Sequence, residues 1–306
     1  MKRATGAVMA ALVIGMSSAG PAEAARPSRG AQHLGVAECA VDVTTSGMVL
    51  TATHVVRDGR VRGLPGGLTE AVAINDRGQV LGAVGAEPVL WDGRRTVALT
   101  PAAADPDERW RFDDVSATGV TVGDVSEPWP SQERTAFRRA KDGTITRLTA
   151  PGVRSGALAV NASGQVVGDV WDGDLQVAVR WDADGTTTRL ESLGGHSLAI
   201  GINDAGQAVG YSYRTDGTIE PVSWSADGAV TALGGTGSAL AVNARGDVVG
   251  EQYSPQRAFV RTRAGSVRTF PAPDDGVSML SAVNSRGWAV GCELAGDTES
   301  AIIVRA

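Results

Sequence analysis

One short phrase recurs along the chain and limits the folds that are open to it. The segment "LAVNASGQVVG" (158–168) returns, with few changes, as "VAINDRGQVLG" (72–82), "IGINDAGQAVG" (200–210), "LAVNARGDVVG" (240–250) and "SAVNSRGWAVG" (281–291). A catalytic motif occurs once, or twice in a duplicated domain, whereas a phrase repeated this often builds one unit of a larger architecture in each copy. The sequence therefore says more about shape than about activity.

Two weaker copies, which carry Thr44 and Ser116 in the place of the asparagine, extend the series. The seven positions, which we call the asparagine slots, are separated by 31, 41, 45, 42, 40 and 41 residues and hold Thr44, Asn75, Ser116, Asn161, Asn203, Asn243 and Asn284. A glycine follows each slot three residues later, and six copies have a second glycine four residues beyond the first. The period is therefore about 40 residues.

Each unit has the pattern of four short antiparallel strands. An apolar strand leads into Asn-x-x-Gly, in which the asparagine can accept a backbone hydrogen bond and the glycine supplies a positive φ. A second strand, a variable loop, a third strand such as "AVRW" (178–181), a turn such as "DADG" (182–185) and a fourth strand follow. No stretch keeps a helical period, so the chain is all-β. A four-stranded unit of this length is typical of a β-propeller blade. We predict seven blades, or six if the first copy, shortened between Met48 and Val55, is vestigial.

The two ends of the chain favour a closed ring over an open β-solenoid. The last unit stops at "AIIVRA" (301–306), after its third strand, while "AQHLGV" (31–36) precedes the first unit with the spacing of a fourth strand. An open stack needs polar end caps and has no reason to divide one unit between the termini. We therefore expect the N-terminal strand to complete the last blade, and Trp91, Trp181 and Trp224, which end third strands, to pack between blades.

The two cysteines test this closure. Cys39 begins the first strand of the first blade and Cys292 ends the second strand of the last blade, so both lie at the same end of their units. Ring closure would bring them together, and we predict a Cys39–Cys292 disulfide in an oxidising compartment. Two unpaired thiols are the alternative.

The N-terminus has the features of a secretory signal peptide. Residues 1–24, "MKRATGAVMAALVIGMSSAGPAEA", start with Lys2 and Arg3, continue with an apolar run and end in Ala-Glu-Ala. We predict cleavage after Ala24, which leaves one domain over 25–306 that is secreted, extracellular or associated with the cell wall. The apolar run is shorter than the ~20 residues that span a bilayer. A net charge of −6 with scattered arginines argues against nucleic acid and membrane-surface partners. We expect a monomer.

The repeated A-x-x-[IV]-N-x-x-G-x-[VA]-[VL]-G phrase resembles the HAF-type extracellular repeat family of bacteria. The third-strand Ala-Phe of that family is present as Ala136-Phe137 and Ala258-Phe259, but its histidine is replaced by Thr135 and Arg257. The resemblance covers residues 31–306. It implies repeats and export, and it implies no particular activity.

The sequence offers little chemistry. His196 adjoins Ser197, but neighbours along a strand point to opposite faces, so we expect no nucleophile and base there. No histidine or cysteine cluster has zinc spacing. Loop carboxylates such as Asp172 and Asp174 are of the kind that binds calcium. Because none follows the full D-x-[DN]-x-[DN]-G pattern, we predict solvated loops with no cofactor, and calcium stays the alternative.

The remaining signal is positional. The loops between second and third strands differ most among the units and carry Trp129, Trp171, Tyr211, Tyr213 and Tyr253, with Asp172 and Asp174 beside them. These side chains combine apolar rings with hydrogen-bonding groups, which suits sugars or exposed peptide. Capping of blade ends by the same rings is the alternative. We therefore predict a non-enzymatic module that binds an extracellular glycan or protein. A polysaccharide hydrolase or lyase that uses channel carboxylates and a purely structural surface protein are the competing functions.

Overall fold

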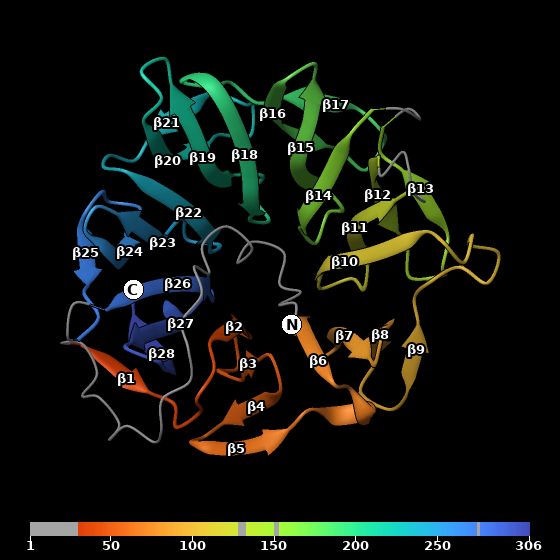
Figure 1. Cartoon of the computed structure of the whole chain (residues 1–306), viewed down its shortest axis with the longest axis horizontal. Helices are drawn as coiled ribbons and strands as arrows, with labels where there is room; N and C mark the ends of the chain where they lie inside the picture. Colours follow the sequence, from red (N-terminus) through yellow and green to blue (C-terminus); the bar gives the residue numbers. More distant parts are fainter. Residues whose placement is uncertain (1–29, 128–132, 150–152, 274–275) are drawn as a thin grey trace.

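Seven four-stranded antiparallel sheets stand around a central axis (Figure 1). The computed structural model describes residues 30–127, 133–149, 153–273 and 276–306. The signal-peptide interpretation of residues 1–24 and the candidate Trp129 lie outside these ranges. The predicted seven-bladed, all-β propeller is confirmed, and the six-bladed alternative is excluded because the short first copy forms a complete sheet.

The strands follow the chain from the inside of each blade to the outside. Blades 1 to 3 contain β2 (Ala40–Val43), β3 (Val49–Thr51), β4 (His54–Arg57) and β5 (Arg60–Gly63); β6 (Glu70–Ile74), β7 (Val80–Val84), β8 (Glu87–Trp91) and β9 (Thr96–Ala98); and β10 (Arg109–Val115), β11 (Thr121–Ser126), β12 (Arg134–Arg139) and β13 (Ile145–Arg147). One short 3-10 turn, η2 (Pro65–Gly67), joins the first two blades.

The other four blades have the same order. They contain β14 (Ser155–Val160), β15 (Val166–Asp172), β16 (Leu175–Trp181) and β17 (Thr187–Arg189); β18 (Gly194–Ile202), β19 (Ala208–Arg214), β20 (Ile219–Trp224) and β21 (Val230–Ala232); β22 (Gly237–Val242), β23 (Val248–Tyr253), β24 (Gln256–Arg261) and β25 (Val267–Phe270); and β26 (Val277–Val283), β27 (Trp288–Ala295) and β28 (Thr298–Arg305), to which β1 (Ala31–His33) is added.

The ring closes as the sequence predicts. Strand β1 pairs antiparallel with β28, Ala31 opposite Val304 and His33 opposite Ile302, and so forms the outer strand of the seventh blade. Cys39 and Cys292 form a disulfide between the first and last blades, with their Cα atoms 4.7 Å apart. A buried disulfide of this kind indicates an oxidising, extracytoplasmic environment.

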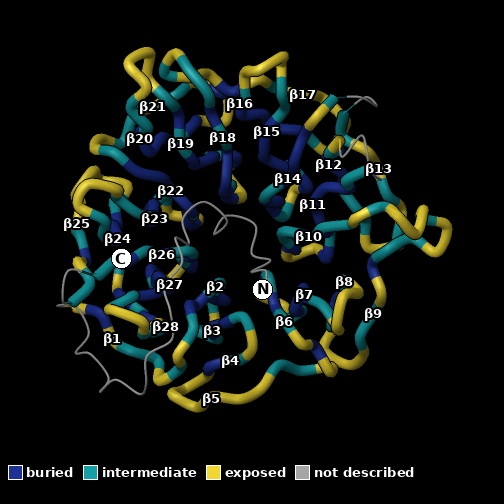
Figure 2. Tube along the Cα trace, in the orientation of Figure 1, coloured by how far each residue is buried: buried dark blue, intermediate teal, exposed yellow. Residues whose placement is uncertain are grey.

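The apolar core is divided among the contacts between neighbouring blades. Each of seven buried clusters joins residues of two adjacent blades, including the pair of blades at the seam. Figure 2 shows buried residues along the strands of the ring, with exposed residues mostly in the turns and outer strands. Trp181 and Trp224 are 1 % and 0 % exposed within two of these clusters, as predicted for inter-blade packing, whereas Trp91 is only partly buried. The blades are therefore held by side-to-side burial of apolar surface.

The repeated glycines have two different structural reasons. The glycine three residues after each slot has a positive φ, for example 81° at Gly164. The second glycine, such as Gly168, lies opposite a β-bulge that interrupts the first strand of the blade between Ala157 and Ala159. A Cβ at any of the six second glycines would lie only 1.8–2.1 Å from a carbonyl oxygen of that first strand. Only glycine fits there without movement of the backbone.

The asparagines connect one blade to the next. Inside its own turn each asparagine accepts backbone N–H groups, as Asn161 Oδ1 accepts from Gln165 N at 2.9 Å. Its Nδ2 then donates to the main-chain carbonyl of the next slot around the ring, at 2.8–3.1 Å in five blades (donors Asn75, Asn161, Asn203, Asn243 and Asn284). The repeat thus encodes contacts between blades as well as the turn.

Two blades lack the asparagine and use a different link. In the blades with Thr44 and Ser116, the residue two places earlier is Asp42 or Asp114, where the other blades have alanine or glycine. Asp42 Oδ2 accepts the N–H of Ile74 at 2.9 Å, and Asp114 Oδ2 accepts the N–H of Val160 at 2.8 Å. Each bond reaches the next blade, so all seven blade contacts carry a side-chain to main-chain hydrogen bond.

Candidate functional site

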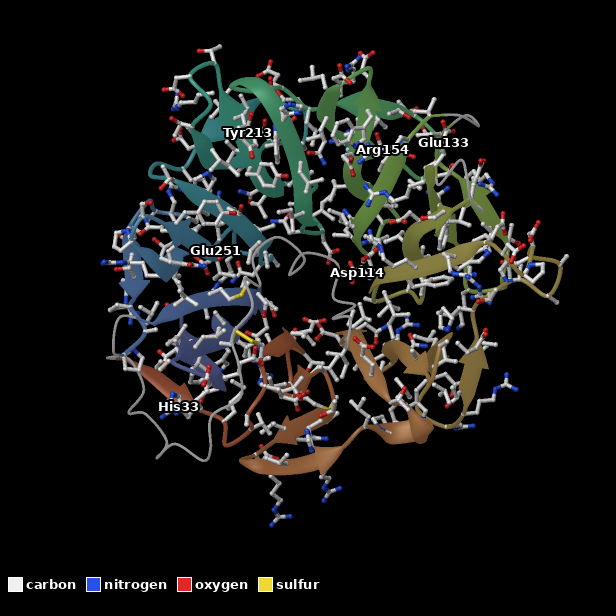
Figure 3. All side chains as sticks on the ribbon, viewed as in Figure 1. His33, Asp114, Glu133, Arg154, Tyr213 and Glu251 are labelled. Carbon is white, nitrogen blue, oxygen red and sulfur yellow. A yellow bond between two sulfur atoms is a disulfide. The ribbon has the colours of Figure 1, made fainter. Side chains whose placement is uncertain are left out.

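The second strands end, and the third strands begin, at the end of the propeller opposite the asparagine slots. We call this end, over blades 3 to 6, the binding face. The residue that follows the second repeat glycine lies here and is polar in these four blades: Asp124, Asp169, Tyr211 and Glu251. Figure 3 shows Arg154, Tyr213 and Glu251 on three successive blades, and Asp114 on the inner side of the ring.

Four aromatic side chains form a continuous row across blades 4 and 5. The ring centroids of Trp171 and His196 are 6.1 Å apart, those of His196 and Tyr213 are 5.8 Å apart, and those of Tyr213 and Tyr211 are 6.0 Å apart. We call Trp171, His196, Tyr213 and Tyr211 the aromatic row. The rings meet at 54–77°, so the row presents edges and hydroxyl groups together with ring faces.

Polar contacts fix the ends and the middle of the row. His196 Nδ1 accepts the N–H of Gln176 at 3.0 Å, which leaves the proton of the neutral ring on Nε2. The exposed Arg154 places its guanidinium carbon 4.0 Å from the centre of the Trp171 ring. Burial raises the pKa of Tyr211 to about 12, so its hydroxyl stays neutral and can donate or accept a hydrogen bond.

Tyr253 lies beside the row on blade 6. Its side chain is 38 % exposed, and its hydroxyl shares a 2.6 Å hydrogen bond with Ser238 Oγ. Burial also raises the pKa of Tyr253 and that of Glu251 on the same strand. The tyrosine hydroxyl is therefore held in position while part of the ring faces solvent.

A buried network of charges underlies the face at blades 3 and 4. Arg111 donates to Asp124 at 2.6 Å, and Arg134 donates to Asp169 at 3.3 Å while lying 3.9 Å from Asp124. Gln176 Nε2 adds a 3.1 Å bond to Asp169. Burial raises the pKa of Asp124 and of Asp169, although the arginines beside them act in the opposite direction. The network positions two partly exposed guanidinium groups at the edge of the face.

The structure brings together some of the residues that the sequence selected. Trp171, Tyr211 and Tyr213 meet in the aromatic row, and Tyr253 lies next to it. Asp172 instead forms a 2.9 Å ion pair with Arg189 on an outer strand, and Asp174 lies in the exposed turn between β15 and β16. These two carboxylates are therefore placed at the rim of the blade.

Sequence reasoning missed Arg134, Asp124, Asp169 and the part that His196 plays in the row. A signal was present, because "GDV" follows the strand pattern twice (123–125 and 168–170) with a carboxylate where a buried strand would carry an apolar residue. His196 and Ser197 do point different ways. Ser197 Oγ accepts the N–H of Ala178 at 2.9 Å and is buried, as Ser155 and Ser278 are at the same position of other blades. Ser197 is a structural residue.

The described residues contain neither a cluster of metal ligands nor a helix that could span a membrane. No group of three or more histidine, cysteine, aspartate or glutamate side chains there is arranged to hold an ion. In the same ranges no helix has the length and hydropathy that crossing a membrane requires.

The fold defines a class of protein, the seven-bladed β-propellers, and comparison with solved structures agrees. Virginiamycin B lyase from Staphylococcus aureus matches with a TM-score of 0.56 and 12 % identity, over 90 % of this chain and 99 % of that one. Puromycin hydrolase matches with a TM-score of 0.58 and 15 % identity, over 89 % and 52 %. The extracellular domain of a putative one-component system from B. thetaiotaomicron matches with a TM-score of 0.53 and 9 % identity, over 90 % and 39 %.

These similarities establish the fold alone, because a lyase, a hydrolase and an extracellular domain of a putative one-component system share it at this level of identity. No family model and no curated protein sequence matches the chain. Function therefore has to be argued from the site.

Proposed function

We propose that this chain is an exported, non-enzymatic propeller that binds an extracellular glycan across the aromatic row. The observation that carries the proposal is the unbroken sequence of rings from Trp171 to Tyr211, flanked by Arg154 and by the Tyr253 hydroxyl. Rings supply apolar faces for the C–H surface of a sugar, and the tyrosine hydroxyls, the imidazole of His196 and the cationic guanidinium of Arg154 supply hydrogen-bonding groups for its hydroxyls.

The surrounding chemistry favours binding over turnover. A glycoside hydrolase needs two carboxyl groups that reach the substrate from either side of the bond. Two of the three carboxyl groups that follow the second repeat glycine on this face, Asp124 and Asp169, are 2 % and 1 % exposed and are occupied by Arg111, Arg134 and Gln176. The third, Glu251, accepts a hydrogen bond from Gln256 at 3.5 Å. The two aspartates hold Arg111 and Arg134 in place, and Asp169 also binds Gln176, whose main-chain N–H donates to His196 of the row.

Export and repeat family belong to the same proposal. The signal-peptide features of residues 1–24 and the disulfide are both typical of a protein that works outside the cytoplasm. The repeat phrase supports membership of the HAF-type extracellular family. Expression in a bacterial host with export, followed by N-terminal sequencing of the released protein, should give a chain that begins at Ala25.

Depletion assays against a panel of insoluble wall and matrix polysaccharides test the binding itself. Trp171→Ala and Tyr213→Ala should each weaken retention about tenfold or more, since truncation of a central aromatic anchor removes a large share of binding energy. Trp288→Ala is the matched control: Trp288 stacks on Arg305 at the opposite end of the propeller, and its loss should leave retention unchanged.

The same assay separates the competing functions. The binding proposal requires retention without newly formed reducing ends or unsaturated sugars. Turnover that Asp169→Asn abolishes would replace it with the hydrolase or lyase alternative. Retention of the wild type by none of the glycans, with a folded protein confirmed by circular dichroism, would contradict it and leave a protein ligand or the structural-protein alternative.

A further inference from the structure

A second site lies away from the binding face, between blades 1 and 2. A cavity of about 630 Å³ opens there beside the asparagine-slot turns, lined by Met48, Val55, Ile74, Val80 and Trp91 on its apolar side. Its volume falls within the range of pockets that hold small organic ligands, about 300–1,000 Å³. The aromatic row plays no part in it.

The cavity exists because blade 1 is short. Strand β4 turns directly into β5 through Asp58 and Gly59, both with left-handed φ (50° and 71°). The third strand of this blade carries Val55 opposite Leu50, in the register position that Arg138 occupies opposite Val122 in blade 3 and Arg180 occupies opposite Val167 in blade 4. Those arginines reach main-chain carbonyls of the next blade, so a small side chain stands in blade 1 where they place a long one.

Trp91 is more exposed than the tryptophans at the same position of other blades. It holds the same repeat position as Trp181 and Trp224, which neighbouring blades bury to 1 % and 0 % exposure. Trp91 is only partly buried, and its ring forms part of the cavity wall. The apolar ring surface that Trp181 and Trp224 bury is accessible to a ligand at Trp91.

The open side of the cavity is strongly basic. Of the described residues that line it, Arg57, Arg60 and Arg62 are cationic and Asp58 alone is acidic, in a protein whose net charge is −6. Arg57 is 3.8 Å from Asp58, and all four residues of β5 are exposed. Arg60 and Arg62 are two residues apart on one strand, so their side chains lie on the same face.

We propose that this cavity binds a small amphipathic anion, a carboxylate or sulfonate on an apolar ring system. The ring system packs on Trp91, Val55 and Met48, and the anionic group is held by the arginines of β4 and β5. Guanidinium groups suit this role because their planar donors match the oxygens of such anions. The site takes a free small molecule, so it can be occupied together with a glycan at the other end of the propeller.

Fluorescence titration with 8-anilinonaphthalene-1-sulfonate on the folded, disulfide-bonded protein tests the proposal, with 1-naphthoate and neutral 1-naphthamide as competitors. We expect saturable binding to one site that naphthoate displaces and naphthamide does not. Arg60→Ala/Arg62→Ala should weaken it about tenfold, whereas Arg109→Ala/Arg286→Ala, which removes two exposed arginines elsewhere, should not.

A filling variant separates the cavity from general charge attraction. Val55→Phe keeps every charge but occupies the space beside Trp91, so it should abolish saturable binding while circular dichroism and the melting temperature report an intact fold. Unsaturable binding, equal affinity in both arginine pairs, full binding by Val55→Phe, or a dimer that covers β5 in light scattering would each overturn the proposal.

Discussion

Single residues show how the ring tolerates the loss of its repeated asparagine. Asp42 and Asp114 each accept two main-chain N–H groups, one from the following residue and one from the next blade. An asparagine donates to a carbonyl of the next blade, whereas these aspartates accept from an amide, so the partner changes while the connection is kept. Hydrogen bonds to a charged group contribute about 1.5–3 kcal/mol each, less the cost of burying the charge.

That cost makes the stability of the fold depend on pH. Burial raises the pKa of Asp42 to about 6 and that of Asp114 to about 7, against hydrogen bonds that act in the opposite direction. Because the folded pKa lies above the unfolded value, stability from these groups is fully present below about pH 4 and is lost as pH rises through 6 to 7.

Thermal melts between pH 5 and pH 8 check this expectation. Asp114→Asn removes the charge with little change of shape, so its melting temperature should fall less over that range than that of the wild type. The exposed Asp297→Asn is the control and should follow the wild type. Parallel curves for wild type and Asp114→Asn would contradict the assignment.

At the level of paired strands, close approach of two backbones requires a glycine. At Gly168 a Cβ would lie 1.9 Å from the carbonyl oxygen of Gly156, in backbone that cannot move without breaking the β14–β15 pairing. Gly168→Ala should therefore destabilise the fold by about 3 kcal/mol or more, by the same mechanism as other overpacked sites. Chemical denaturation measures the loss.

A second glycine supplies the matched control for that substitution. Gly63 ends an edge strand, has no positive φ and has open space around the Cβ position. Gly63→Ala should change the free energy of unfolding by about 0.5 kcal/mol or less. Equal losses at Gly63 and Gly168 would show that close approach to the neighbouring carbonyl has no part in the effect.

The strands also mark what the sequence could and could not predict. The period, the Asn-x-x-Gly turns and the divided last unit predicted seven blades, the N-terminal strand and the disulfide, because each depends on spacing alone. The aromatic row was only partly visible: Trp171 and Tyr213 were selected, but their neighbour His196 was placed by the register of β18. That register depends on bulges, such as the shift between Gly194 and Ser197, which spacing does not reveal. The links through Asp42 and Asp114 depend on the same bulged geometry.

For the whole molecule, the seam between the last and first blades decides whether the ring holds. The disulfide joins residues 253 positions apart, so by chain entropy its loss should cost about 5 kcal/mol at most. Cys39→Ser/Cys292→Ser should unfold at lower urea concentration than the oxidised wild type, and reductant should bring the wild type close to the variant. A midpoint that reductant does not change would contradict a stabilising role.

Strand β1 closes the same seam through non-covalent contacts, so we expect its contribution to stability to depend on whether the disulfide is present. It contributes pairing with β28, the burial of Ala31 against Phe270, and the 3.1 Å contact between His33 and Glu293. A chain that begins at Leu34 should lose stability relative to one that begins at Gly30, and the loss should be larger when both cysteines are serine. With the disulfide intact, blades 1 and 7 stay covalently joined after β1 is removed. Without the disulfide, β1 and the segment that follows it are the covalent connection between blade 7 and blade 1. A double-mutant cycle in urea measures this coupling, and strictly additive losses would show that the strand and the disulfide stabilise separate parts of the ring.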